Sequence, residues 1–585
     1  MESRESLNSA LNIQSASTSK LSEEYKAESA KSSKVKASES NNPESVNLNN
    51  PESPKSNNLE SPKPSKYAYM VRRSIYPSRW RFLIASIAVL LSAAMMFSYV
   101  AMDVCDILPG PLTLRSQRNA TRVSSPRVIL NAETLAKGVS YGKNINRVQA
   151  QKLIDNLMSD PSFSSSTSAV IMDAKGHVIA SHDITALREP ASTLKTLTAA
   201  VASRNLDMGS TLDTQVFLLP ESSSERVIST NSNARRIVLR GNGDMLLGVG
   251  GNDWHHVNGR AGLTTLASRT AAALKIDNIR KVSLEVDDSL FGKKRAPSLI
   301  YDTDVERRFY ARTSSLAIDD ARQRDFAAQG VDADAMTDFP LSDPYPAHSV
   351  GLVFAKMLEK QGIKVVSSAE NAANFSKEDE SSDKSSANLV IPVSETKSLV
   401  EPNSVLLAKV SSAPLSEIMA YMLRISDNTL AEEFGRLTAI AMRKSNSPEG
   451  AVEAVKEGLR KLNVDIRGLH MSDCSGLSPK SKLSVATLAQ VQVLNIKADS
   501  GGAASAEGLS LPGLVGTARK RLADESAAGM LRVKTGSLSE VTSISGNVSR
   551  HGGGVLTFAV VANYPSDFWG AFVAINKFMA ELPKL

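Results

Sequence analysis

The chain has 585 residues, of which 42% are hydrophobic and 22% charged, and its formal net charge at pH 7 is +7. This is enough chain for several globular domains, and the mild charge, without a dense basic stripe, excludes an extended nucleic-acid surface. Two cysteines exclude a disulfide scaffold. The seven histidines are scattered and no C-x-x-C or H-E-x-x-H pattern occurs, so we expect neither a metal site nor a cofactor.

The first predicted element is a polar tail over residues 1–80. It is rich in Ser, Asn, Glu, Lys and Pro. Such a composition buries too little apolar surface to offset the entropy of ordering, so we expect a disordered tail on the cytoplasmic side.

A membrane anchor is predicted at residues 81–102, because Phe82–Met102 contains no charged residue and about 20 apolar residues can cross a bilayer as a helix. Arginines precede it and acidic residues follow it, which places the rest of the chain outside the cytoplasm. A cleaved signal peptide is the alternative, but the apolar run is long and no small-residue cleavage site follows. We therefore expect a single-pass protein of the cell membrane whose folded part is extracytoplasmic.

After a linker at residues 103–145, a folded core is predicted to begin with its first part at residues 146–205. A helix is expected at 147–158, and strand-like runs at 168–172 and 177–180 flank a turn. Residues 206–402 are interpreted as an inserted α+β domain, which includes a helix within 344–362 and a loose loop at 367–388.

The core is expected to resume over residues 403–585. Helical patterns occupy 414–441, 448–462 and 568–582, and strands are expected at 542–548 and 554–564, joined by the glycine-rich turn His551–Gly554.

The segment Arg188–Ala200 contains the tetrapeptide Ser192-Thr-Leu-Lys195 at a predicted helix start. Ser192 and Lys195 are three residues apart, so they share one helix face. A lysine whose pKa is lowered by burial and by nearby cations can take the proton of a serine hydroxyl. On its own this tetrapeptide is weak evidence, since the pattern is common by chance.

Two further motifs follow in order, Ser426-Asp-Asn428 and Lys534-Thr-Gly536. The three together are the signature of serine β-lactamases and penicillin-binding proteins. We predict Ser192, Lys195, Ser426, Asn428 and Lys534 as catalytic residues: the nucleophile, its base, a proton relay, a holder of the substrate amide and an attractor of the substrate carboxylate.

The same strand supplies the predicted substrate-binding residues Thr535, Gly536 and Ser537. Thr535 offers a hydroxyl to the carboxylate, and Gly536 allows close backbone approach. The backbone N–H groups of Ser192 and Ser537 are the expected oxyanion donors.

The sequence resembles the class C low-molecular-mass penicillin-binding proteins, the D-alanyl-D-alanine carboxypeptidase/endopeptidase family, over about residues 145–580. Besides the three motifs, the matching segments are Gly241–Asp244, Asn258–Leu263, Asp287–Phe291, Asp473–Ser478 and Gly516-Thr517. The resemblance implies an α+β penicillin-binding protein/serine β-lactamase-like fold whose five-stranded sheet is interrupted by an insertion. It also implies a carboxypeptidase, with a possible endopeptidase activity, that acts on peptidoglycan stem peptides and is acylated by β-lactam antibiotics.

One residue differs from the family pattern, and the residue that selects the substrate side chain is not fixed by the motifs. Cys474 stands where the family usually has a glycine. The insertion is expected to select the third stem-peptide residue, and Asp244 and Asp287 are candidates for that role.

Two other functions are weighed against the carboxypeptidase. A β-lactamase would use the same acylation but needs a deacylating base, for which no clear residue stands out. A non-catalytic cell-wall-binding scaffold would keep the fold, but the intact Ser192, Lys195, Asn428 and Lys534 argue against it.

Overall fold

The computed structural model describes residues 78–104, 144–221, 234–324, 332–335, 339–367, 389, 391–498, 500–522 and 526–585. The predicted tail and linker lie almost entirely outside the described residues, as does nearly all of the predicted loop at 367–388. Helix α2 (Ser78–Val104) belongs to a unit of its own and begins inside the predicted tail. Within the part of the chain that is described, no helix combines the length and apolarity needed to cross a membrane. The anchor therefore stays a prediction.

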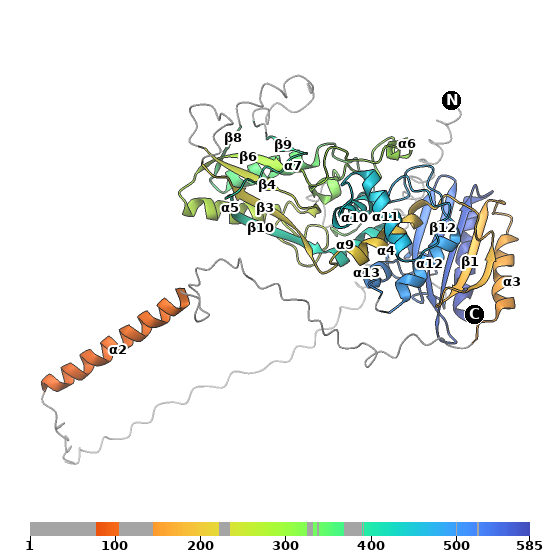
Figure 1. Cartoon of the computed structure of the whole chain (residues 1–585), viewed down its shortest axis with the longest axis horizontal. Helices are drawn as coiled ribbons and strands as arrows, with labels where there is room; N and C mark the ends of the chain where they lie inside the picture. Colours follow the sequence, from red (N-terminus) through yellow and green to blue (C-terminus); the bar gives the residue numbers. More distant parts are fainter. Residues whose placement is uncertain are drawn as a thin grey trace, which may run out of the picture. The chain divides into compact units, whose positions relative to one another are not determined.

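The core is an antiparallel five-stranded sheet in the order β11-β12-β13-β1-β2 (Figure 1). Its strands are β1 (Thr167–Asp173), β2 (Val178–His182), β11 (Leu531–Leu538), β12 (Val541–Ser549) and β13 (Val555–Asn563). The predicted hairpin at 168–180 is confirmed as β1–β2, and the predicted strands near the C-terminus are confirmed as β12 and β13. The N-terminal and C-terminal parts of the core thus meet in one sheet.

Helices cover both faces of this sheet, with α3 and α12 on opposite sides in Figure 1. The bounds are α3 (Arg147–Met158) and α14 (Phe568–Glu581) for one face, and α4 (Lys195–Asn205), α11 (Pro448–Lys461) and α12 (Val485–Ile496) for the other. Alternate residues of β1 enter the two cores: Ile171 packs with α3 and α14, whereas Val170 and Met172 pack with α4 and α12. This alternation follows from the two-residue repeat of a strand.

The inserted segment builds a second sheet in the order β10-β3-β4-β6-β8, with β9 beside β6. Its strands are β3 (Thr211–Leu218), β4 (Arg235–Arg240), β6 (Lys281–Asp287), β8 (Lys364–Val366), β9 (Val393–Ser394) and β10 (Val405–Pro414). Helices α5 (Leu263–Ile276) and α7 (Pro346–Lys360) share its hydrophobic core. Because β10 pairs with β3, this sheet continues past the predicted division at residue 402.

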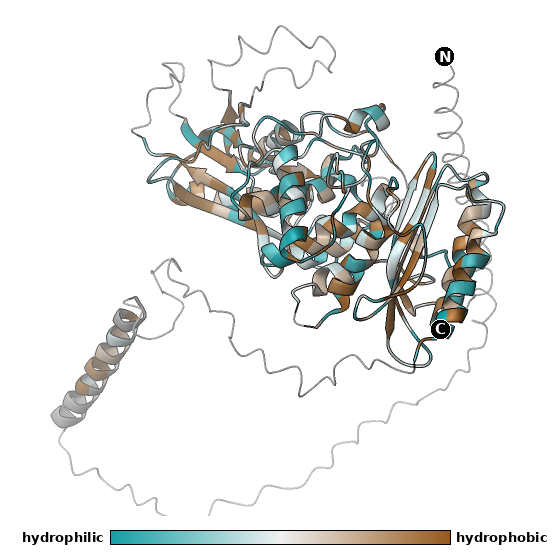
Figure 2. Cartoon of the chain, turned by 45° about the vertical axis from the view of Figure 1, so that its right-hand side comes forward, coloured by the Kyte–Doolittle hydropathy of each residue, from teal (hydrophilic) through white to brown (hydrophobic). Residues whose placement is uncertain are grey.

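Smaller elements connect this sheet to the core. They are β5 (Asp244–Leu247), which pairs with β7 (Leu316–Ile318), and the short helix α6 (Ile300–Thr303). The short helix α13 (Ala503–Glu507) belongs to the core, where it packs with α4 and α12. In Figure 2 the strands of both sheets are drawn mainly in brown and white, whereas teal gathers on the helices and loops around them. The architecture is therefore α+β, with two sheets that each bury an apolar face.

One helix prediction is wrong. The pattern at 414–441 predicted a single helix, but the structure has α9 (Leu415–Ile425) and α10 (Asn428–Ala441). Ser426 is left-handed, with φ of 64°, and ends α9. Asp427 caps α10 by accepting a hydrogen bond from the Leu430 N–H at 2.8 Å, which is a common role of aspartate at a helix start. The break places Ser426 and Asp427 between the two helices and Asn428 at the first residue of α10.

Candidate active site

The Ser192 turn is held between the helices and the edge of the sheet. A short 3-10 helix, Ala191–Leu194, leads directly into α4, which begins at Lys195. The Ser543 hydroxyl of β12 donates to the Pro190 carbonyl at 2.7 Å. Ser192 is half-buried, whereas Lys195 is fully buried. The predicted helix start is thus anchored on the sheet just before the serine.

Lys195 joins the first two motifs. Its Nζ lies 2.9 Å from Ser192 Oγ and 2.6 Å from Asn428 Oδ1, and it also donates to the Ser475 carbonyl at 3.0 Å. Burial lowers the pKa of Lys195 to about 7, although Asp473 and Asp427 raise it. An amine with this pKa is partly neutral at pH 7, so it can accept the proton of the Ser192 hydroxyl.

Lys534 joins the second and third motifs. It is fully buried on β11, and its Nζ donates to Ser426 Oγ at 2.9 Å and to the Thr535 carbonyl at 2.8 Å. Burial and, secondarily, the charge of Lys195 hold the pKa of Lys534 well below its usual range. An arriving carboxylate would stabilise the ammonium form, so the site favours a substrate with a free carboxylate.

The substrate-binding residues predicted on β11 lie beside this cluster. The Thr535 hydroxyl shares a hydrogen bond of 2.7 Å with Thr517, and Ser537 is exposed at the end of the strand. A Cβ atom on Gly536 would overlap Ser543 Oγ and stand 3.0 Å from the Ser192 backbone nitrogen. Glycine is therefore needed here because β11 runs against the Ser192 turn.

The turn Asp473–Ser478 forms the wall behind Lys195. The Asp473 carboxylate accepts hydrogen bonds from the backbone N–H groups of Ser475, Gly476 and Ser478, at 2.9, 2.6 and 2.6 Å. This cradle directs the Ser475 carbonyl at Lys195. The contact between Lys195 and the Ser475 carbonyl could not be predicted from the residue pattern. Only the family resemblance of Asp473–Ser478 indicated that this turn belongs to the site.

Cys474 occupies space that a glycine on the neighbouring helix leaves open. The thiol is fully buried, and a Cβ atom on Gly435 of α10 would overlap its Sγ. The Cys474 backbone still makes two hydrogen bonds, to Glu432 and from Thr198. The departure from the family pattern is thus accommodated locally.

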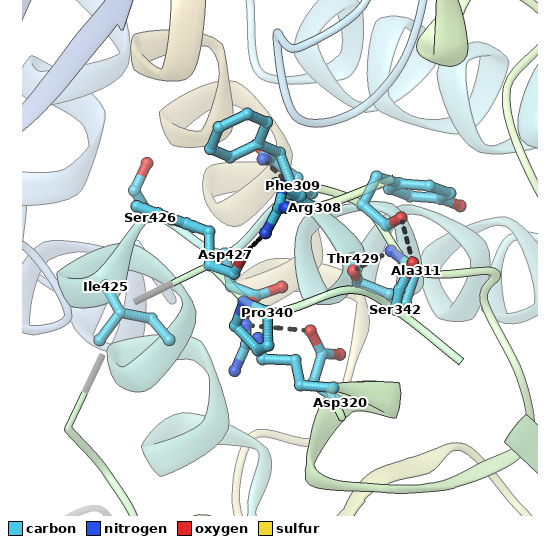
Figure 3. A pocket seen from close by; sticks show the side chains of 14 residues that line it. Arg308, Phe309, Ala311, Asp320, Pro340, Ser342, Ile425, Ser426, Asp427 and Thr429 are labelled. Atoms are coloured by element: carbon cyan, nitrogen blue, oxygen red, sulfur yellow. Dashed lines mark hydrogen bonds and ion pairs between the residues drawn. The ribbon is translucent and has the colours of Figure 1, made fainter. Parts of the chain in front are cut away.

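A pocket lies where the inserted segment meets the second motif (Figure 3). Its walls come from the inserted segment and from the end of α9 and the start of α10; they are Arg308–Ala311, Asp320, Arg322, Phe339, Pro340, Ser342 and Ile425–Thr429. In Figure 3 the Ser426 hydroxyl points away from the Asp427 carboxylate. The pocket therefore adjoins the catalytic cluster and offers cations, a carboxylate and aromatic rings.

The two candidates for selecting a stem-peptide side chain are not part of this pocket. Asp244 and Asp287 are each 1% exposed and absent from its walls. Asp287 instead accepts hydrogen bonds from the Ser398 hydroxyl, at 2.7 Å, and the Leu399 N–H, at 3.0 Å. Both carboxylates lie in the interior of the insertion, so the structure does not support either one as a residue that contacts substrate.

Nothing in the described residues resembles a metal centre, because no group of three or more His, Cys, Asp or Glu side chains is placed to hold an ion. The chemistry that the geometry offers is that of a serine nucleophile, a neutral lysine base and a cationic edge strand.

The chain is similar in sequence and in fold to known proteins. The chain is 29% identical over 391 residues to carboxypeptidase DacB of Mycolicibacterium smegmatis, which covers 64% of this chain and 71% of that protein. It is 24% identical over 501 residues to a D-alanyl-D-alanine carboxypeptidase of Actinomadura sp. (strain R39), covering 77% and 87%. The fold is similar to penicillin binding protein 4 from Haemophilus influenzae, with a TM-score of 0.56, 18% identity, and coverage of 74% of this chain and 99% of that one.

The model of the D-Ala-D-Ala carboxypeptidase 3 (S13) family matches residues 150–329 and 391–577, which include all three motifs. Because this match takes in more than half of the chain, the protein belongs to the D-Ala-D-Ala carboxypeptidase 3 (S13) family.

Proposed function

We propose that this serine carboxypeptidase cleaves the terminal D-Ala–D-Ala bond of peptidoglycan stem peptides through an acyl-enzyme on Ser192. The observation that carries the assignment is the 2.9 Å contact between the buried Lys195 Nζ and Ser192 Oγ. Neutral Lys195 takes the hydroxyl proton as Ser192 attacks the carbonyl of the penultimate D-Ala. Backbone N–H groups of Ser192 and Ser537 are the donors proposed for the oxyanion.

The leaving D-Ala needs a proton as the peptide bond breaks. Ser426 is the proposed relay, since its hydroxyl accepts from Lys534 at 2.9 Å and lies in the same cluster as Lys195. The terminal carboxylate of that D-Ala is proposed to bind Lys534 and Thr535. Water then attacks the acyl carbonyl, with Lys195 again accepting a proton, and this releases the shortened peptide and restores Ser192.

The pocket beside Ser426 is proposed to receive the side chain of the third stem-peptide residue. Its walls hold the cations Arg308 and Arg322, the carboxylate of Asp320 and the rings of Phe309 and Phe339, whose centroids are 4.9 Å apart. Such a lining suits a side chain with both charged and aliphatic parts. We therefore propose this pocket, in place of Asp244 and Asp287, as the site that selects the third stem-peptide residue.

β-Lactam antibiotics are proposed to acylate Ser192 as well.

An uncleaved helix at residues 81–102 is proposed to anchor the protein in the cell membrane, with the catalytic part outside the cytoplasm. The anchor rests on the uncharged run and its basic flank in the sequence. Extraction tests it: a protein released from membranes by carbonate or high salt would not be anchored in this way.

The catalytic assignment is tested by incubating the full-length protein with a penicillin, digesting it and locating the adduct by mass spectrometry. We expect the adduct on the peptide that contains Ser192. Ser192→Ala should abolish it and reduce carboxypeptidase activity by about 10⁴-fold or more. An adduct elsewhere, or full activity of the variant, would disprove the assignment, and rapid release of hydrolysed penicillin would favour a β-lactamase instead.

A further inference from the structure

The second motif is held from outside the core. The Asn428 side-chain N–H donates to the Phe309 carbonyl at 2.8 Å, and the Thr429 hydroxyl accepts from the Ala311 N–H at 3.0 Å. Phe309 and Ala311 both belong to the inserted segment. Two successive residues of α10 are therefore fixed by the insertion, which makes it part of the support of the active site.

A third contact involves charge. Arg322 of the inserted segment contacts the Asp427 carboxylate through Nη2, and the same nitrogen lies 3.1 Å from Asp320 Oδ2. The side chain of Arg322 is 8% exposed, and those of Asp320 and Asp427 are 2% exposed. Charges this deeply buried are costly unless they are paired. The guanidinium and the Asp427 carboxylate therefore constrain each other's positions strongly.

Because Asp427 lies between Ser426 and Asn428 in the chain, fixing its carboxylate also fixes the positions of these two catalytic residues. Its Oδ1 accepts from the Leu430 N–H at 2.8 Å and so sets the start of α10. The preceding residue, Ser426, is held in a left-handed conformation and accepts from Lys534. The following residue, Asn428, accepts from Lys195 at 2.6 Å. A shift of the Asp427 carboxylate would move both neighbours relative to the two lysines.

We propose that Arg322 is a positioning residue for acylation: through Asp427 it fixes Ser426 and Asn428 against the lysines, without touching the reacting atoms. This role rests on the proposed acylation of Ser192. It makes the insertion necessary for the chemical step as well as for substrate choice.

Arg324 provides a matched control because it lies two residues away and is similarly placed. It pairs with Asp319 at 2.5 Å and donates to the Ala335 carbonyl at 2.7 Å. Its ion pair is with Asp319, whereas Arg322 pairs with Asp320 and Asp427. Replacing Arg324 removes a buried arginine from the same segment but leaves the contact with Asp427 in place.

The test measures the second-order rate of acylation by a fluorescent penicillin for the full-length wild type and for Arg322→Met, Arg322→Lys, Asp427→Asn and Arg324→Met, each checked for folding by circular dichroism. Penicillin has no third stem residue, so it reports on the catalytic groups rather than on the pocket. We expect Arg322→Met and Asp427→Asn to slow acylation by about 10- to 100-fold, since small misplacements of catalytic groups cost that much. Arg322→Lys should recover part of the rate, and Arg324→Met should stay within about twofold of the wild type.

A double variant separates positioning from general damage. If Arg322 acts through Asp427, then Arg322→Met with Asp427→Asn should be no slower than the worse single variant. On a stem peptide, Arg322→Lys should lower kcat more than it raises KM. Acylation of folded Arg322→Met at the wild-type rate, equal losses in Arg324→Met, or additive losses in the double variant would each overturn the proposal. If Arg322→Met does not fold, the acylation rates of Arg322→Lys and Asp427→Asn test the proposal instead. A wild type that is not labelled at Ser192 would instead disprove the proposed function.

Discussion

The side-chain nitrogen of Lys195, Nζ, lies 2.6 Å from Oδ1 of Asn428, so one hydrogen bond joins the start of α4 to the start of α10. These residues are far apart in sequence, and each is also bonded to a further part of the site: Lys195 to Ser192 and Asn428 to the Phe309 carbonyl. The serine, its base and the inserted segment are thus linked through two side chains.

The pH dependence of acylation follows from Lys195. Burial lowers the pKa of Lys195 to about 7, against the raising effect of Asp473 and Asp427. Since only the neutral amine accepts the Ser192 proton, the rate of acylation should rise between pH 5 and 8, with its midpoint near 7. Stopped-flow measurement with a chromogenic β-lactam would show this. Lys195→Arg keeps the charge but cannot lose its proton, so it should be inactive throughout; a flat profile in the wild type would exclude Lys195 as the base.

Gly536→Ala tests the close approach of β11 to the Ser192 turn. The new Cβ would overlap Ser543 Oγ and come within 2.9 Å of the Pro190 carbonyl oxygen. We expect acylation to slow by about 100-fold, because the turn that carries Ser192 must shift. Adding Ser543→Gly removes the nearest obstructing atom and should restore part of the rate. No recovery in that double variant, with Ser543→Gly alone active, would place the obstruction elsewhere.

The motif trio was predictable from the sequence because each motif is local. Ser192 and Lys195 share a helix face, and Lys534 to Ser537 are consecutive residues of one strand. The hairpin β1–β2 and the paired strands β12 and β13 were likewise marked by apolar runs and turn residues. Their assembly into one five-stranded sheet was implied only by the family resemblance, and the pairing of β1 with β13 confirms it.

The break between α9 and α10 was missed because the apolar periodicity is strong on both sides of it. Asp427 as a helix cap was the available signal. The contact between Arg322 and Asp427 could not be predicted, since it depends on how the insertion folds back on α10. The choice of Asp244 and Asp287 as selectivity candidates has the same cause. The sequence shows only that each carboxylate follows a predicted strand, whereas the tertiary structure shows that both are buried.

Gly435 and Cys474 should be energetically coupled. Gly435→Ala would place a methyl group onto Cys474 Sγ and 3.1 Å from its Cβ, and such overpacking typically costs 1–3 kcal/mol. Cys474→Gly, the residue usual in the family, removes both atoms. We therefore expect Gly435→Ala alone to lower the free energy of unfolding by about 1–3 kcal/mol, and the double variant to recover most of it, since an alanine also favours the helix. Denaturant unfolding measures all three variants, and equal losses in the single and double variants would refute the coupling.

Glu433 should make the protein less stable as the pH rises. Both of its carboxylate oxygens are buried without a hydrogen-bond partner, and burial, followed by the charges of Asp320, Asp244 and Asp427, raises its pKa well above its usual range. A carboxyl group whose pKa is raised on folding contributes stability below its unfolded pKa, and this is lost as the pH rises through its folded pKa. Glu433→Gln has the same shape and no charge. Its free energy of unfolding should exceed that of the wild type by on the order of 1 kcal/mol at pH 8, and the difference should shrink towards pH 5.

Thermal unfolding of both proteins from pH 5 to 8 measures this difference, with Glu417→Gln on the exposed side of α9 as the control. The control should change stability by less than about 0.5 kcal/mol at any pH. If Glu433→Gln were less stable than the wild type at pH 8, the carboxylate would have to be ionised and paired in the folded protein.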